Sequence, residues 1–167
     1  SRLLPTVINS LGGTACECPV GGPKIKEQMR REKAHAAAEL SGHFIYEELS
    51  YADSGTLTAI LLINSLSSSD KKLSQLVDEL PTFHHSGEVN FSVVDNNALF
   101  EKLKSVFIGG EESTLDGLKI TYPDWWFSIR ASNTEPLVRL VLEADTPQLL
   151  DIKRNELTEI IQTFASN

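Results

Sequence analysis

Hydrophobic and polar positions follow two kinds of spacing along the first part of the chain. Short apolar runs at residues 3–10 and 44–46 are typical of strands, whereas residues 23–38 and 56–66 carry apolar side chains at helical intervals. Pro23 suits the first turn of a helix, because the N–H that proline lacks is not needed there. We therefore expect a β-α-β-α arrangement here, which is the pattern of an α/β unit.

The periodicity weakens over residues 67–87. A serine-rich break is followed by a helical pattern over 70–80, which a proline ends. Residues 81–87 have no apolar period, and they include the pair His84-His85, which we interpret as solvated. We therefore place a linker between two domains within this stretch.

Strand patterns dominate from residue 88 onward. Val89, Phe91 and Val93 alternate with polar residues, as on a strand with one buried face. Further strand patterns, separated by turn signals, cover 118–122, 125–130 and 137–143.

Two helical patterns accompany these strands. The first covers 96–107 after Asp95, a residue suited to an N-cap, and its inward side chains include Val106. The second is introduced by Thr146 and Pro147. The fold class is thus α/β plus α+β: a partial mixed α/β domain, then a small domain with a four-stranded, mainly antiparallel sheet and helices on one face.

The composition is that of an ordinary soluble protein, with 41% hydrophobic and 23% charged residues among 167. A formal net charge of -8 opposes non-specific binding to nucleic acid or anionic membranes, so we expect neither as a partner. The longest mostly apolar stretch, residues 57–66, is far shorter than the roughly 18 to 20 residues that cross a bilayer. We therefore expect a cytoplasmic protein that holds any phosphate ligand by local contacts.

The cysteines Cys16 and Cys18 are one residue apart, with no second pair and no histidine at a spacing suited to zinc. They do not form a disulfide framework. We interpret them as two small residues in a loop of a cytosolic protein, with a redox or metal role as the alternative.

Residues 130–136, of sequence Arg-Ala-Ser-Asn-Thr-Glu-Pro, lie between two predicted strands. The guanidinium of Arg130, the hydroxyls of Ser132 and Thr134, the carboxamide of Asn133 and the loop N–H groups are the donors that a phosphate dianion needs. The alternative is a polar hairpin loop, because these residue types are common in turns. An arginine at the end of a strand favours the phosphate interpretation.

Residues 39–43, of sequence Glu-Leu-Ser-Gly-His, lie between a predicted helix and a predicted strand. Glu39 and Ser41 can hydrogen-bond to sugar hydroxyls, Gly42 lets a ligand approach the backbone, and His43 can contact a charged group. The alternative is that Gly42 ends the helix while Glu39 and His43 share a surface turn. A metal site here would lack a further ligand at a suitable spacing.

Taken in this order and about 90 residues apart, the two segments resemble those of the α-D-phosphohexomutase superfamily, the phosphomannomutases and phosphoglucomutases. The resemblance covers essentially the whole chain, since residues 6–10 and 19–21 also look like pieces of the family. It implies that residues 1–68 correspond to most of the family's third domain, residues 69–87 to a helix and linker, and residues 88–167 to its C-terminal fourth domain.

By this resemblance, the family's enzymes move a phosphoryl group between a phosphoserine and the C1 and C6 oxygens of a hexose, through a bisphosphate intermediate. The residues with an implied role in sugar binding are Glu39, Ser41 and His43, and those implied to bind the phosphate that is not transferred are Arg130, Ser132, Asn133 and Thr134.

The family's phosphoserine loop, of Thr-Ala-Ser-His-Asn-Pro type, and its magnesium loop, of Asp-Gly-Asp-Gly-Asp-Arg type, have no counterpart in this sequence. With the missing initiator methionine, this leads us to expect a C-terminal fragment that holds no catalytic residue or metal ligand and is inactive alone. The resemblance implies Mg²⁺ for the full-length enzyme and hexose 1,6-bisphosphate as activator or intermediate. It implies mannose or glucose phosphates as ligands, and the N-terminal domains of the same chain as partners.

Two alternatives stay open beside the mutase interpretation. One is a non-catalytic phosphosugar-binding module that never had catalytic domains. The other is a structural or interaction module with a degenerate site, and the intact donor set at residues 130–134 argues against it.

Overall fold

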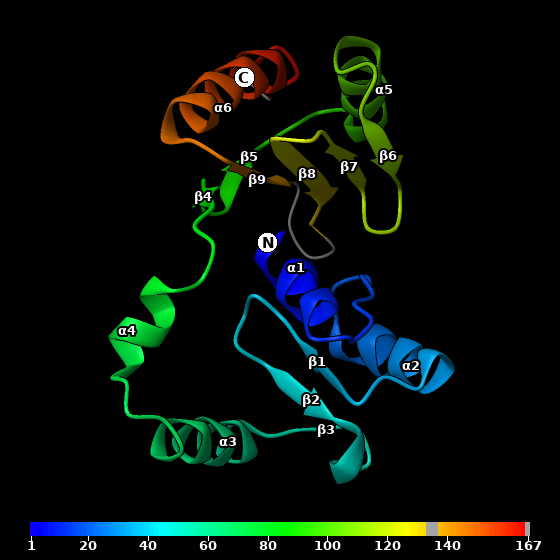
Figure 1. The fold of residues 1–167 in the computed structure, drawn as a ribbon. Coiled ribbons are helices and arrows are strands. Elements are labelled where there is room, and N and C mark those ends of the chain that lie inside the picture. Colours follow the sequence, from blue (N-terminus) through cyan, green and yellow to red (C-terminus); the bar gives the residue numbers. More distant parts are fainter. Residues whose placement is uncertain (133–136, 166–167) are drawn as a thin grey trace. The chain divides into compact units, whose positions relative to one another are not determined.

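The computed structural model describes residues 1–132 and 137–165. The chain divides into two compact units, which we call the large unit (Ser1–Ala15 and Thr82–Asn167) and the small unit (Cys16–Pro81). Figure 1 shows the elements of both. Each unit is described by itself.

A six-stranded antiparallel sheet organises the large unit, with the strand order β4-β9-β8-β7-β6 and with β5 also paired to β9. The strands are β4 (His84–His85), β5 (Val89–Phe91), β6 (Glu111–Ser113), β7 (Leu118–Thr121), β8 (Trp125–Ala131) and β9 (Val138–Ala144). All four strands predicted from the sequence are present, which confirms the α+β character of this part. Two short strands are added. The pair His84-His85, predicted to be solvated linker residues, forms one of them and pairs with Ala144 and Glu143.

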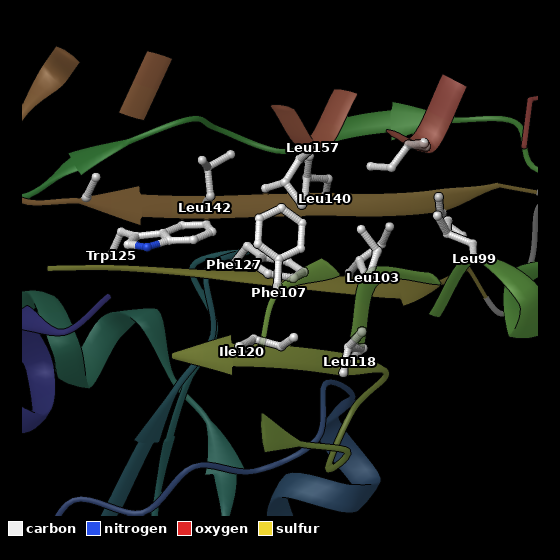
Figure 2. Packing of buried hydrophobic residues seen from close by; sticks show 14 of the residues in the cluster. Leu99, Leu103, Phe107, Leu118, Ile120, Trp125, Phe127, Leu140, Leu142 and Leu157 are labelled. Carbon is white, nitrogen blue, oxygen red and sulfur yellow. The ribbon is translucent and has the colours of Figure 1, made fainter. Parts of the chain in front are cut away.

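Two helices, α5 (Asn96–Val106) and α6 (Pro147–Gln162), cover one face of this sheet (Figure 1). Alternate residues of β8, namely Trp125, Phe127 and Ile129, belong to the buried cluster that also contains residues of both helices (Figure 2). The intervening residues of β8 therefore belong to the opposite face. One face of β8 therefore packs against the helices, and the other face carries Ser128 and Arg130.

The predicted N-cap of α5 is confirmed, and α6 begins at the predicted Thr146 and Pro147. The Asp95 side chain accepts from the Ala98 N–H at 3.0 Å, and the Thr146 side chain accepts from the Leu149 N–H at 3.2 Å. The prediction that Val106 faces the core is wrong. It is 38% exposed, because the helix ends there and the next residue, Phe107, turns inward instead.

The first apolar run is a helix, α1 (Leu3–Ser10), and not the predicted strand. Its apolar residues come in pairs four positions apart, a spacing that suits a helix as well as an irregular strand. Arg2 ties this segment to the sheet of the large unit: its backbone N–H donates to Glu143, and its guanidinium donates to the carbonyls of Pro123 and Asp124. Local hydrogen bonds and this anchor satisfy the backbone without a strand partner.

The small unit contains a three-stranded antiparallel sheet in the order β1-β2-β3. Its elements are α2 (Gly22–Glu32), β1 (Ala36–Ala38), β2 (Phe44–Tyr46), the 3₁₀ turn η1 (Glu47–Leu49), β3 (Ala52–Asp53), α3 (Gly55–Ser67) and α4 (Leu73–Asp78). The predicted helix over 23–38 is therefore too long. Helix α2 ends at Glu32, because Lys33 after it takes a left-handed conformation with φ 55°. The alanines at 36–38 pair with β2 instead.

Little of the small unit is buried. Its core cluster consists of Ile25, Met29 and Ile45. Helix α3 has no buried residue, although its composition is largely apolar. Its exposed apolar side chains include Ile60, Leu61, Leu62 and Ile63. Across the part of the chain that the structure describes, no helix is both long and apolar enough to span a membrane.

Candidate substrate-binding segments

The segment 39–43 is a hairpin loop between β1 and β2, and not a junction between a helix and a strand. The Glu39 N–H donates to the His43 carbonyl at 3.0 Å, and the Gly42 N–H donates to the Glu39 carbonyl at 3.0 Å. Gly42 has φ 87°, a conformation that glycine adopts without strain. This glycine therefore closes a hairpin and does not end a helix, so the helix end that the alternative placed here is wrong, whereas Glu39 and His43 do share a turn.

The carboxylate of Glu39 accepts a hydrogen bond from the start of helix α2. The Gly21 N–H donates to Glu39 Oε1 at 3.1 Å, and Gly21 is the N-cap of that helix. The start of a helix carries a partial positive charge, which favours an anion there. The side chain of Glu39 is only 15% exposed, so its orientation is fixed by this contact.

Ser41 and His43 lie beside Glu39. His43 Nδ1 is 2.8 Å from Ser41 Oγ and 3.5 Å from Glu39 Oε2, while its Nε2 is 4.0 Å from Asp53 Oδ2. The three predicted sugar-binding residues are thus gathered on one loop. A carboxylate, a hydroxyl and an imidazole in contact offer both donors and acceptors, which is the mixture that sugar hydroxyls require.

Asp53, which the sequence analysis did not single out, joins this group. The cap of the next helix is its neighbour Ser54, which accepts from the Leu57 N–H at 3.1 Å. Asp53 instead accepts from the Phe44 N–H at 3.0 Å. It reaches the loop because β3 pairs with β2, a contact that only the strand register could have revealed.

Arg130 is the second-last residue of β8, on the sheet face that the helices leave open. The predicted phosphate-binding loop begins directly after this strand, where the Ser132 N–H donates to the Leu137 carbonyl at 2.8 Å. The other two predicted phosphate ligands, Asn133 and Thr134, lie outside the described residues. The structure therefore describes the strand end with Arg130 and the backbone pair that closes the loop.

Two charged residues near Arg130 escaped the sequence analysis. Arg139 is its direct cross-strand partner, and Glu88 lies 3.7 Å from it, measured from Oε2 to Nη2. The position of Arg139 could have been found by counting outward from a hairpin closed between residues 132 and 137. Glu88 offered no such signal, since it lies more than 40 residues earlier in the sequence.

A buried carboxylate lies further along the same face of the sheet. Glu143 is 1% exposed, and it accepts from the Arg2 backbone N–H at 2.9 Å and from the Trp126 indole N–H at 3.1 Å. Burial alone would raise the pKa of Glu143. Hydrogen bonds from Ser1, Arg2 and Trp126, with the nearby terminal ammonium, outweigh burial and hold that pKa below its ordinary value.

Within residues 1–132 and 137–165, no three His, Cys, Asp or Glu side chains gather in a way that could hold a metal ion. Neither Cys16, which is exposed, nor Cys18, which is half-buried, forms a disulfide.

The comparisons with known proteins agree with these features. The sequence model described as "Phosphoglucomutase/phosphomannomutase, alpha/beta/alpha domain III" matches residues 1–83, and the one for the C-terminal domain of the same family matches residues 88–159. The chain therefore belongs to the phosphoglucomutase/phosphomannomutase family, as the resemblance of its two segments indicated. Within that family, it contains the regions that match domain III and the C-terminal domain.

Individual relatives give the same result. A phosphomannomutase of Methanocaldococcus jannaschii is 38% identical over 161 residues, which is 96% of this chain and 36% of the relative. A phosphomannomutase of Escherichia coli K12 is 34% identical over 91% of this chain and 34% of its own length. A crystal structure of a phosphoglucomutase/phosphomannomutase family protein from Burkholderia thailandensis superposes with a TM-score of 0.83 at 28% identity, over 99% of this chain and 36% of that one. The chain thus spans about a third of the length of the curated relatives it matches.

Proposed function

We propose that this chain supplies substrate binding to a phosphohexomutase that moves a phosphoryl group between C1 and C6 of mannose or glucose phosphate. The hairpin loop 39–43 contacts hydroxyls of the sugar, and the segment 130–134 holds the phosphate that is not being transferred. One observation carries this proposal: Glu39 is anchored at the start of α2 with Ser41 and His43 against it, in a region that matches a domain of a hexose phosphate mutase family.

The chemistry of the hairpin loop suits a sugar more than an anion. One oxygen of the Glu39 carboxylate is occupied by the Gly21 N–H, so the other oxygen can accept from a hydroxyl without losing its orientation. Ser41 can donate or accept. Since a carboxylate repels phosphate, this loop contacts the neutral part of the ligand.

Arg130 and the segment after it suit the phosphate. A guanidinium binds phosphate oxygens in a fixed fork, and its hydrogen bonds are strengthened by charge. Ser132, Asn133 and Thr134 add a hydroxyl, an amide and a second hydroxyl within four residues of Arg130. This segment binds tightly enough to hold one end of the substrate while the other end reacts.

The covalent step requires groups other than those described here. We propose that a phosphoserine and a magnesium ion are held by other residues of a longer mutase, because the family's phosphoserine and magnesium loops have no counterpart among these 167 residues. In this proposal, a hexose 1,6-bisphosphate is the intermediate and activator, and the enzyme works in the cytoplasm. The 167 residues alone do not turn over substrate, because phosphoryl transfer requires the phosphoserine and the metal ion.

The partner of this chain is the remaining part of that mutase. Helix α3 supports this, because it buries none of its many apolar residues, which an α/β/α domain would normally cover. The net charge of -8 leaves nucleic acid and anionic membranes as unsuitable partners.

The test is a titration of the 167-residue chain with mannose 1-phosphate and glucose 1-phosphate, followed by amide NMR shifts. We expect shifts in the loop 39–43 and in residues 130–132. Arg130→Ala should weaken binding by about 1.5 to 3 kcal/mol, the scale for losing a charged hydrogen-bond partner.

Arg154→Ala is the matched control, because Arg154 is a surface arginine of α6 that pairs with Asp151. It removes the same charge and should leave the affinity unchanged. Equal affinities for the wild type and Arg130→Ala would remove Arg130 from the site. A lack of shifts at millimolar ligand would contradict sugar phosphate binding by this chain.

A further inference from the structure

Arg130 has charged neighbours in a row across the sheet. The register pairs Arg130 on β8 with Arg139 on β9, and it pairs Arg139 with Asn90 on β5. Glu88 comes two residues before Asn90, directly ahead of β5, and the alternation of side chains places it on the same face as Asn90. The arginines of the adjacent strands β8 and β9 and the glutamate that precedes β5 (Figure 1) therefore share one face.

The carboxylate of Glu88 contacts both arginines, one with each oxygen. Glu88 Oε1 accepts from Arg139 Nη1 at 3.0 Å, and Glu88 Oε2 lies 3.7 Å from Arg130 Nη2. All three side chains are partly buried, with exposed fractions of 24% for Arg130, 27% for Arg139 and 31% for Glu88. This shielding makes the contacts stronger than those of a fully solvated pair.

Glu88 counters a repulsion that the register creates. Two like charges directly opposite each other on antiparallel strands destabilise the pairing and push the side chains apart. The bridging carboxylate draws both guanidinium groups toward one point. Glu88 by itself offsets only one of the two guanidinium charges.

On the other side of Arg130, the neighbouring position is Gly117, whose backbone lies close to β8. Gly117 precedes β7, and a Cβ built on it would lie 2.8 Å from Arg130 Cα and 2.3 Å from the Ile129 carbonyl oxygen. A side chain at position 117 would not fit, so Arg130 has no side-chain neighbour from that position. Glu88 Oε2 approaches its guanidinium from the opposite side, at 3.7 Å.

We propose that Glu88 is a positioning residue for phosphate binding, which holds Arg130 and Arg139 side by side so that both guanidinium groups face the phosphate. The inference rests on the proposed function in one respect, namely that Arg130 binds phosphate. Glu88 contacts a single terminal nitrogen of Arg130, and a guanidinium carries five N–H donors. The contact orients the fork and leaves donors for the phosphate oxygens.

The substitution Glu88→Gln separates positioning from simple charge. If Glu88 acted only through its charge, its removal would make the cluster more positive and would strengthen anion binding. If it positions the arginines, its removal weakens binding. We expect Glu88→Gln to raise the dissociation constant for inorganic phosphate about three- to tenfold, measured by amide shifts of residues 128–132 in the 167-residue chain.

The matched control is Glu159→Gln, an exposed glutamate on α6 that loses the same charge away from the arginines. It should leave the affinity for phosphate within about 1.5-fold of the wild type, since surface charges contribute little. The Nε–Hε signals of Arg130 and Arg139 give a second readout. Without ligand, the chemical shifts of these Nε–Hε signals should change in Glu88→Gln but not in Glu159→Gln. Both variants should keep the dispersed amide spectrum of the folded protein.

Combining Glu88→Gln with Arg130→Ala completes the test. If Glu88 positions both arginines, the double variant loses less affinity than the sum of the two single losses, because one of the guanidinium groups that Glu88 orients is already absent. Unchanged or tighter binding by Glu88→Gln, with weaker binding by Arg130→Ala, overturns the role of Glu88 and leaves the proposed function standing. Unchanged binding by Arg130→Ala overturns both.

Discussion

The two units differ sharply in how much of their apolar surface is buried. Among the described residues, the core cluster of the large unit contains sixteen buried side chains, and that of the small unit contains three. Aromatic rings add to the large core, where Phe107 packs edge-on against Trp125 at 5.7 Å between centroids. The rigidity of each candidate binding segment therefore has a different source.

In the large unit, the strand that carries Arg130 is fixed by packing. Phe127 and Ile129 are fully buried on the same strand, so Arg130 projects from a backbone that cannot shift without disturbing the core. In the small unit, the loop that carries Glu39 is fixed by hydrogen bonds to Gly21 and between its own backbone groups. A sheet supports one segment, and local polar contacts support the other.

The largest loss of stability is expected when an aromatic ring is removed from the core of the large unit. Phe127→Ala leaves a cavity in the large unit and should lower its free energy of unfolding by about 3 to 5 kcal/mol. Ile45→Ala should cost the small unit about 2 kcal/mol, because its sparse core can collapse around the change. Denaturant unfolding followed by tryptophan fluorescence reports the large unit, since Trp125 and Trp126 are the two tryptophans of the chain.

Amide signals of residues 36–46 report the small unit in the same samples. Losses of equal size in the two variants would contradict the proposed difference between the cores. A loss of fluorescence cooperativity in Ile45→Ala would also contradict it, because that substitution should leave the large unit unchanged.

The same difference in burial explains which elements could be predicted. Strands β7, β8 and β9 belong to the large core, and apolar strand patterns between turn signals located them. The prediction failed for short elements such as β1. Ala36–Ala38 has the intrinsic preference of a helix, yet it forms β1 because residues 44–46 lie beside it, and that pairing is not local.

The candidate site was predicted in part for a similar reason. Residue types within one loop identified Glu39, Ser41 and His43, and the structure brings these three together. Asp53 and Glu88 were missed, because they reach their clusters only through strand pairing. Sequence spacing describes contacts within a segment, whereas contacts between segments depend on register.

Acid should weaken the large unit through Glu143. The pKa of this carboxyl is lowered in the folded state, so its ionised form stabilises the fold above the ordinary value of 4.5 and that stability is lost as pH falls through the folded value. Glu143→Gln should cost about 1 to 3 kcal/mol at pH 7, since it leaves the contacts with Arg2 and Trp126 weakened. Its deficit relative to the wild type should shrink below about pH 4.5.

Unfolding midpoints of both proteins from pH 7 to pH 3, again by tryptophan fluorescence, measure that deficit. Glu159→Gln is the control, because its exposed carboxyl should leave the pH profile unchanged. A deficit of Glu143→Gln that stays constant across this range would mean that the charge of Glu143 adds nothing to the stability of the large unit.

The smallest effect is expected on helix α3 of the small unit. Ile63 is 62% exposed, and Ile and Ser have similar helix propensities, so Ile63→Ser should change the free energy of unfolding by less than about 0.5 kcal/mol. Leu99→Ser in α5, where Leu99 is fully buried, should lower the free energy of unfolding by more than about 3 kcal/mol. Both values come from urea unfolding, with the amides of each helix as reporters. A cost above about 1 kcal/mol for Ile63→Ser would show that α3 is packed in solution, and the two units would then be more alike than their cores indicate.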